Sequence, residues 1–194
     1  MQRDIERVLI SQAQIARRVA ELAELITADH SPPRQDGPLE LTIVPILTGA
    51  MIFCGDLIRR IPMAMQIGLM TVSSYPGRSV SSQGPQVVAQ QLGDVAGRHV
   101  LLVDDILDSG QTIRMVVPVL RERGAASVRT CVLLRKDRPA ARDTHVDYVG
   151  FDIPDAFVVG YGLDFDNYYR NLPDIVTLKD RVIELTRDAR ERTV

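Results

Sequence analysis

Three acidic residues stand close together in the stretch "HVLLVDDILDSGQTI", which runs from His99 to Ile113. Asp104 and Asp105 directly follow four apolar residues, and Asp108 comes three residues after the pair. Removing carboxylates from water is costly unless a cation or hydrogen-bond donors compensate, and adjacent carboxylates repel each other. The spacing therefore indicates a site where these acids meet a metal ion or a ligand with hydroxyl groups.

The turn after the acids has the composition of a phosphate-binding loop. We predict a helix over 111–123, and the first N–H groups of a helix lack internal partners and carry the positive end of its dipole. Gly110 lets the backbone approach a ligand closely, while Ser109 and Thr112 supply hydroxyls. The turn alone is equally compatible with Asp108 or Ser109 acting only as a helix cap. Because a cap needs a single acid, the additional pair favours a sugar phosphate, and we expect a ribose.

The elements that must position these residues alternate between strands and helices. Such alternation implies right-handed crossovers and a mostly parallel sheet, whose ligands bind beyond the carboxyl ends of the strands. The loops that follow the predicted strands should therefore gather at one edge. Apolar periodicity and turn residues predict helices over 4–28, 48–61 and 111–123, strands over 39–47, 63–72, 86–91, 99–106, 127–136, 146–153 and 157–163, a turn-rich linker at 30–38 and a long polar loop at 73–86.

The composition fits one α/β domain. The chain has 194 residues, of which 45% are apolar, enough to build a core. It carries 23 Lys and Arg against 25 Asp and Glu, and this balance argues against broad binding of nucleic acid. Two cysteines make neither a disulfide framework nor a zinc site. The charged start and the lack of an apolar run near the ~20 residues that span a bilayer predict a cytoplasmic protein with no membrane segment.

Four apolar residues, two acids, two apolar residues and then Asp-Ser-Gly-x-Thr resemble the phosphoribosyl-pyrophosphate motif of the type I phosphoribosyltransferases. The resemblance covers nearly the whole chain after the first helix. It is strongest to the hypoxanthine–guanine branch, through "ILTGAMIFCGDL", "SSY", "LLRK" and the long segment "VDYVGFDIPDAFVVGYGLDFDNYYRNLPDI".

The resemblance implies a fold and an assembly. We expect an α/β fold with a mostly parallel five-stranded sheet flanked by helices and covered by a small hood. A single domain would span 1–194, with its core over about 30–160 and its hood built from about 1–29 and 161–194. The family also implies a homodimer or homotetramer.

The resemblance further implies a Mg²⁺-dependent reaction of a purine base with phosphoribosyl pyrophosphate, which yields a purine nucleoside monophosphate and pyrophosphate. Asp108 would be the catalytic general acid/base at N7 of the purine. Asp104 and Asp105 would face the ribose hydroxyls directly or through the ion. The implied roles are, in full, phosphoribosyl and 5′-phosphate binding by Asp104, Asp105, Asp108, Ser109, Gly110, Gln111 and Thr112, pyrophosphate binding by Thr48, Gly49 and Arg170, purine binding by Lys136, Phe157, Val158 and Asp164, a lid at Ser74 and Tyr75, and ligation of one or two Mg²⁺ by Asp104, Asp105 and Asp164.

Two of the implied purine ligands also have ordinary structural explanations. A lysine after a strand, such as Lys136, is usually a solvated surface residue. An aromatic residue within "FVVGY", such as Phe157, is usually part of the core. Three further positions depart from the family pattern. Thr48 stands where Lys is common, Pro76 follows Tyr75 where Gly is common, and Asp104 replaces the commoner Glu.

Three alternatives stay open. A phosphoacceptor receiver domain also ends a strand in an acid pair, but near its chain start rather than at 104–105. An RNA-binding regulator that senses phosphoribosyl pyrophosphate would share the motif but lack the purine pocket. The nearest alternative is a xanthine-preferring or adenine-specific relative. Lys136 disfavours adenine because a fixed cation favours a 6-oxo group, whereas the side chains say little about xanthine.

Overall fold

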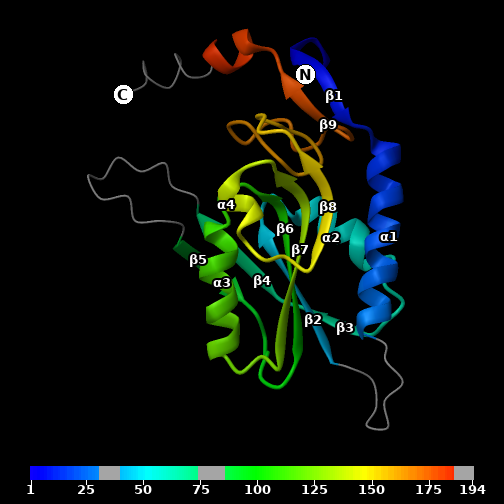
Figure 1. Cartoon of the computed structure of the whole chain (residues 1–194), viewed down its shortest axis with the longest axis vertical. Helices are drawn as coiled ribbons and strands as arrows, with labels where there is room; N and C mark the ends of the chain where they lie inside the picture. The colour runs from blue at the N-terminus through cyan, green and yellow to red at the C-terminus, as the bar shows by residue number, and fades with distance from the viewer. Residues whose placement is uncertain (31–39, 74–85, 186–194) are drawn as a thin grey trace, which may run out of the picture.

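The centre of the fold is a sheet whose strands run mostly in one direction (Figure 1). The computed structural model describes residues 1–30, 40–73 and 86–185. The strands of the sheet are β2 Leu41–Leu47, β3 Met65–Ile67, β4 Leu69–Ser73, β5 Gln86–Gln91, β6 His99–Leu107, β7 Ser127–Lys136 and β8 Tyr148–Ile153. Consecutive neighbours β4, β2, β6, β7 and β8 are parallel, which confirms the expected five-stranded parallel core. β3 adds a short parallel segment beside β2, and β5 adds an antiparallel edge beside β4.

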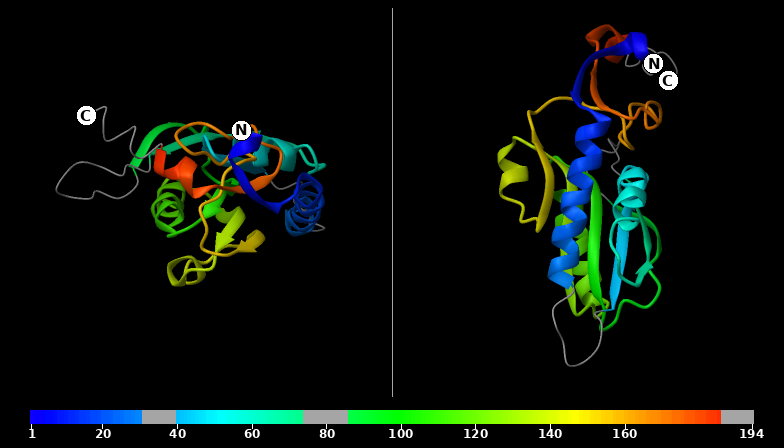
Figure 2. Two further views of the ribbon diagram at one scale, coloured as in Figure 1. Left: turned by 90° about the horizontal axis from the view of Figure 1, so that it is seen from above. Right: turned by 90° about the vertical axis from the view of Figure 1, so that its right-hand side faces the viewer.

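Helices cover both faces of the sheet (Figure 2). They are α1 Gln12–His30 and α2 Met51–Ile58 on one face, and α3 Gln111–Glu122 and the short α4 Pro139–Arg142 on the other. Alternate side chains of a strand point to opposite faces. In β6, Leu101 and Val103 pack with α1 and α2, whereas Val100 and Leu102 pack with α3. Burial on both faces explains the uninterrupted apolar run before the acids.

A small hood lies above the sheet (Figures 1 and 2). A short 3-10 helix, Gln2–Asp4, leads into β1 Ile5–Ile10, which pairs antiparallel with β9 Ile175–Leu178. Val159 forms a bridge to Val176 of β9, so the segment after β8 is part of the same unit. The hood thus joins the first and the last strands of the described chain.

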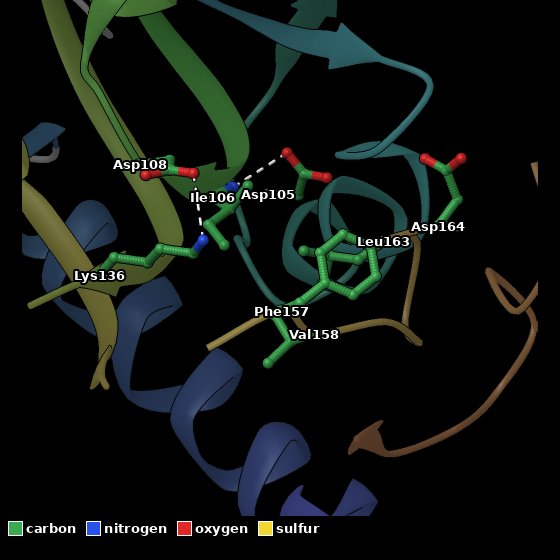
Figure 3. A pocket seen from close by; sticks show the side chains of 8 residues that line it. All are labelled: Asp105, Ile106, Asp108, Lys136, Phe157, Val158, Leu163 and Asp164. Carbon is green, nitrogen blue, oxygen red and sulfur yellow. Dashed lines mark hydrogen bonds and ion pairs between the residues drawn. The ribbon is translucent and has the colours of Figure 1, made fainter. Parts of the chain in front are cut away.

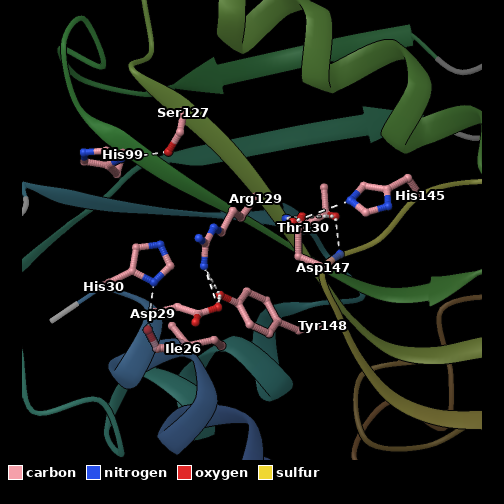
Figure 4. Close-up of polar contacts among 10 residues, drawn as sticks. All are labelled: Ile26, Asp29, His30, His99, Ser127, Arg129, Thr130, His145, Asp147 and Tyr148. Carbon is pink, nitrogen blue, oxygen red and sulfur yellow. Dashed lines mark hydrogen bonds and ion pairs between the residues drawn. The ribbon is translucent and has the colours of Figure 1, made fainter. Parts of the chain in front are cut away.

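Polar contacts tie the end of α1 to the sheet (Figure 4). Asp29 Oδ2 accepts hydrogen bonds from Arg129 Nη1 and from the Tyr148 hydroxyl, each at 2.6 Å. Asp147 Oδ2 accepts from the backbone N–H of Thr130 at 2.7 Å and links the starts of β7 and β8 in the same way. These contacts fix α1 against the core sheet, so this helix belongs to the core and not to the hood expected over 1–29.

The helix predicted over 4–28 is wrong in its first part, because Ile5–Ile10 forms β1 and α1 begins only at Gln12. Ile15, Val19 and Ile26 are buried as the helical period requires. The residues before Gln12 instead find hydrogen-bond partners on β9, a strand that lies far away in sequence. Tertiary pairing has overridden the local pattern here.

Two predicted strands also need correction. The strand over 157–163 does not form, because Tyr161, Gly160 and Gly162 have φ values of 51°, 100° and 106°, which no strand accommodates. The strand over 63–72 divides at Gly68 into β3 and β4. The sequence did not indicate β9 or α4. Among the described residues, no helix is both long and apolar enough to cross a membrane.

Candidate active site

A pocket of about 200 Å³ lies beyond the carboxyl ends of β6 and β7 and under the hood (Figure 3). The end of β6, the end of β7 and the hood segment 157–164 supply its walls, so these described segments gather at one edge, whereas most of the predicted loop 73–86 lies outside the described residues. The lining residues are Asp105, Ile106, Asp108, Lys136, Phe157, Val158, Leu163 and Asp164. Six of these eight are residues that the sequence singled out, and the other two are apolar.

Phe157 stands in the pocket wall and keeps 45% of its surface exposed, whereas Val158 is buried. The Phe157 ring meets Phe165 at nearly right angles, with ring centroids 5.3 Å apart. The exposed part of the ring is available to stack on a planar ligand. A role in core packing therefore does not account for this aromatic residue.

Asp104 and Asp105 form an acid pair at the end of β6, in which Asp104 is buried, with 6% of its surface exposed, and Asp105 is half-buried and lines the pocket. The N–H of Asp105 donates to Asp104 Oδ1 at 3.0 Å, and the N–H of Ile106 donates to Asp105 Oδ1 at 2.9 Å. Burial, and then the adjacent carboxylate, raise the pKa of Asp104 well above its ordinary value, and burial raises the pKa of Asp105. The pair therefore favours a cation or hydroxyl donors beside it.

The turn from β6 into α3 has a backbone suited to an anion. Gly110 is the N-cap and has a φ of 71°, a conformation that favours glycine. A β carbon on Gly110 would also overlap Thr144 Oγ1. Arg114, in the first turn of α3, donates to that oxygen and to the Ser109 carbonyl, both at 2.5 Å. The turn is thus fixed with the first amides of α3 at its end.

The helix-cap explanation accounts for little of this turn. Ser109 Oγ accepts from the Gln111 N–H only at 3.4 Å, which is long for a hydrogen bond. The Asp108 carboxylate is directed instead to Lys136, whose Nζ lies 3.1 Å from Asp108 Oδ2, and to Arg138. The cap role is therefore wrong for Asp108 and weak for Ser109.

Asp108 belongs to a closed ring of alternating charges, which we call the charge ring and which consists of Asp108, Lys136, Asp155 and Arg138. Lys136 is the most buried member, with 12% of its side chain exposed, so it is not a solvated surface lysine. Partial burial acts to raise the pKa of Asp108, but hydrogen bonds from Arg138 and Lys136 outweigh it and lower that pKa. Asp108 is therefore held as a carboxylate.

The short loop after β2 packs directly against Asp105. A β carbon on Gly49 would overlap the Asp105 carboxylate, and one on Gly162 would overlap the Gly49 carbonyl. The Leu47–Thr48 peptide bond is cis, and Thr48 is exposed. The backbone of this loop is thus held between Asp105 and the hood.

Arg170 and Asp164 form an ion pair in the hood, next to Gly162. Arg170 Nη2 lies 2.8 Å from Asp164 Oδ1, and Arg170 Nη1 donates to the Gly162 carbonyl at 2.8 Å. Asp164 Oδ2 also accepts from the Asn167 N–H at 2.8 Å. The expected pyrophosphate ligands Gly49 and Arg170 therefore both border Gly162.

Within the described ranges, no group of three or more His, Cys, Asp or Glu could by itself hold a metal ion. Asp164 is paired with Arg170 and is not assembled with Asp104 and Asp105 into a protein-only site. Mg²⁺ usually takes one or two carboxylates and completes its shell with water and substrate phosphates. The acid pair fits that mode of binding.

Residues 9–166 match the family model described as "Phosphoribosyl transferase domain". The chain belongs to the phosphoribosyltransferase family. This membership excludes the receiver-domain alternative, and the matched range contains the acid pair, the charge ring and the turn into α3. Arg170 lies beyond it.

The relatives and solved structures that resemble this chain include phosphoribosyltransferases named for purine bases. The chain is 46% identical over 184 residues to the hypoxanthine-guanine phosphoribosyltransferase of Mycobacterium avium, covering 93% of this chain and 89% of that relative. A crystal structure of a hypoxanthine phosphoribosyltransferase from Staphylococcus aureus matches this chain with a TM-score of 0.84 at 37% identity. The match covers 94% of this chain and 96% of that structure's chain. A variant of the Trypanosoma cruzi hypoxanthine phosphoribosyltransferase, complexed with the product IMP, has a TM-score of 0.82 at 32% identity and covers 94% of each chain.

Three site features were missed or are not described. Arg138 and Asp155 were not predicted, because ordinary charged residues after strands carry no local signal for a contact across the sheet edge. Gly162 was also missed, although its place in "GYGLDF" could have indicated a glycine in a tight segment. The predicted lid residues Ser74 and Tyr75, with Pro76, lie outside the described residues.

Proposed function

We propose that this phosphoribosyltransferase transfers the 5-phosphoribosyl group of phosphoribosyl pyrophosphate to N9 of hypoxanthine and guanine, in purine salvage. The products would be IMP or GMP and pyrophosphate. The observation that carries the proposal is the convergence of Lys136, Phe157 and Asp108 on one pocket beside the acid pair. The named similarity to purine enzymes supports the same choice.

The purine would lie against the exposed ring of Phe157. Lys136 Nζ would donate to the 6-oxo group, a contact that the 6-amino group of adenine cannot accept. Asp164 and Val158, which line the same pocket, would border the base. A 6-oxopurine therefore suits the pocket better than adenine does.

The ribose 5-phosphate would lie along the turn into α3. Residues 108–112 would surround the 5′-phosphate with backbone N–H groups and hydroxyls. Asp104 and Asp105 would accept hydrogen bonds from the ribose hydroxyls or bind a Mg²⁺ that bridges to them. The raised pKa values of both acids support a partner of this kind.

The pyrophosphate would lie between the loop of Thr48 and Gly49 and the side chain of Arg170. One or two Mg²⁺, held by the acid pair and by Asp164, would neutralise the negative charge of the departing pyrophosphate. Arg170 would add a second positive group to the same oxygens.

The chain's own residues then orient the partners and move one proton. The bond between C1′ and the pyrophosphate oxygen breaks, and N9 of the base bonds to C1′. The N7 proton of the base passes to Asp108, which is held as a carboxylate, and the electrons of the broken bond leave with pyrophosphate. Alignment and electrostatic stabilisation supply most of the acceleration.

A steady-state assay with hypoxanthine, guanine, xanthine and adenine tests the proposal. We expect turnover with hypoxanthine and guanine, and its loss when EDTA removes Mg²⁺. Asp108→Asn should lower kcat by about 10²–10⁴-fold, the range for a lost general acid/base. Asp143→Asn, which changes an exposed acid after α4, serves as the control.

Three outcomes would contradict the proposal in different ways. Preference for xanthine would favour the xanthine alternative, and retention of RNA without purine turnover would favour the regulator. Undiminished turnover in Asp108→Asn would remove Asp108 from its role. We also propose that the protein is a homodimer or homotetramer in the cytoplasm. Light scattering tests its oligomeric state.

A further inference from the structure

Arg138 lies outside the pocket lining but binds the acid that we propose for proton transfer. In the charge ring, Asp108 bonds to Arg138 through Oδ1 and to Lys136 through Oδ2, the latter at 3.1 Å. Asp155 forms ion pairs with the same two cations, at 3.4 Å from Lys136 Nζ and 2.8 Å from Arg138 Nε. Each carboxylate thus has one oxygen on each cation.

The backbone around Arg138 is fixed. Its N–H donates to the Lys136 carbonyl at 2.9 Å, and its own carbonyl accepts from Ala141 and Arg142 at 3.1 and 3.0 Å. A guanidinium group is a planar fork that can bind two carboxylates at once. The Arg138 guanidinium thus contacts Asp155 through Nε and Asp108 through Nη1.

A bound purine would compete for the pocket side of the charge ring. Lys136 must offer a donor to the 6-oxo group, and Asp108 must offer an oxygen to N7, but the two are bonded to each other through Oδ2. Once they separate, the Oδ1 contact with Arg138 would remain, because Arg138 does not line the pocket. Hydrogen bonding to the charged form keeps a carboxylate ionised.

We propose that Arg138 is a positioning residue that keeps the Asp108 carboxylate ionised and directed at the base while Lys136 turns to the 6-oxo group. The inference rests on the proposed function of Asp108. The charged groups that face Asp108 are Lys136 from β7 and Arg138 from the start of α4, with Asp155 beyond them. Of the two cations, only Arg138 is free of a proposed contact with the base.

The test is the pH profile of kcat/KM for hypoxanthine in the parent enzyme, Arg138→Gln and Arg138→Lys. In Arg138→Gln we expect the acid limb to move to higher pH, with roughly tenfold lower kcat/KM on that limb, since a charged hydrogen-bond partner of Asp108 is lost. Arg138→Lys keeps the charge and should keep the position of the limb. Arg142→Gln, which changes an exposed arginine of α4 that pairs with Asp137, should match the parent.

A carboxyl ¹³C NMR titration gives a readout without turnover, with the Asp108 signal assigned through Asp108→Asn. We expect Asp108 to titrate at higher pH in Arg138→Gln than in the parent. An unmoved titration overturns the proposal, and so does a uniform loss of activity with an unmoved acid limb. Failure of the proposed function differs from both, because the parent would then turn over no 6-oxopurine while the titration still responded to Arg138.

Discussion

Gly49 has no room for a β carbon, because the Asp105 carboxylate occupies that space. Asp105 cannot easily turn away, since its Oδ1 accepts from the Ile106 N–H at 2.9 Å. We therefore expect Gly49→Ala to displace the loop or the acid and to raise the KM for phosphoribosyl pyrophosphate by about tenfold or more, because small misplacements in a site cost large factors. Steady-state kinetics at saturating hypoxanthine measure this change.

Gly55→Ala is the matched control, because a β carbon at Gly55 in α2 meets nothing within 4 Å. That variant should keep the parent's KM and gain about 0.5–1 kcal/mol of stability, since alanine is the better helix former. Equal KM values in Gly49→Ala and the parent would show that the contact with Asp105 has no part in substrate binding.

Single residues of the site were predictable where a local motif carried them. Asp105, Asp108 and Lys136 were all expected in one pocket, and all three line it. Arg138 was not expected, because its meaning comes from the ends of two other strands that hold Asp108 and Asp155. A sequence motif reports what is adjacent along the chain, and an ion-pair ring depends on what is adjacent in space.

At the scale of elements, α1 packs on one face of the sheet and also binds the edge strand β8 through Arg18. Arg18 Nε donates to the Gly150 carbonyl and Nη2 to the Val149 carbonyl, both at 2.8 Å, on the edge strand β8. Arg18→Met should lower the free energy of unfolding by about 1–2 kcal/mol, because two hydrogen bonds to a charged donor are lost and water replaces them only in part. Urea denaturation measures the change.

The neighbouring variant Arg17→Met changes an exposed arginine on the same helix and should stay within about 0.5 kcal/mol of the parent. If both variants lost the same stability, helix propensity or net charge would explain the effect of Arg18, and the edge-strand contacts would not.

Element boundaries were predictable only where the core enforces a period. Ile15, Val19 and Leu22 are buried on one face of α1, as the sequence pattern indicates. Ile5–Ile10 continues a similar spacing but forms a strand, because its partner β9 is contributed by the other end of the described chain. The segment 157–163 is rich in β-branched and aromatic residues, but the positive φ of Tyr161 prevents an extended strand.

For the molecule as a whole, burial of His30 predicts weaker folding in mild acid (Figure 4). Burial lowers the pKa of His30 below 6.5, against the opposing effect of the hydrogen-bonding contact between Nδ1 and the Ile26 carbonyl. Between the lowered pKa and 6.5 the unfolded chain binds a proton that the folded chain does not, so stability falls as pH falls. Urea denaturation at pH 7.5 and 5.5 should show a larger loss for the parent than for His30→Gln.

His145→Gln provides the comparison, because the His145 side chain is 87% exposed. It tests whether replacing a histidine by glutamine has an effect of its own. The interpretation is wrong if His30→Gln and the parent lose the same free energy of unfolding between pH 7.5 and 5.5. Buried acids such as Asp104 are common to both proteins, so their contribution cancels when the two losses are subtracted.

The hood has a consequence for the order in which this molecule can be completed during synthesis. The ribosome makes Ile5–Ile10 long before Ile175–Leu178, yet the two segments are neighbours in one small sheet. The wall that carries Phe157 is bridged to that sheet through Val159. A nascent chain could therefore form the turn into α3 early, but the wall that carries Phe157 would be completed only after Ile175–Leu178 had been made.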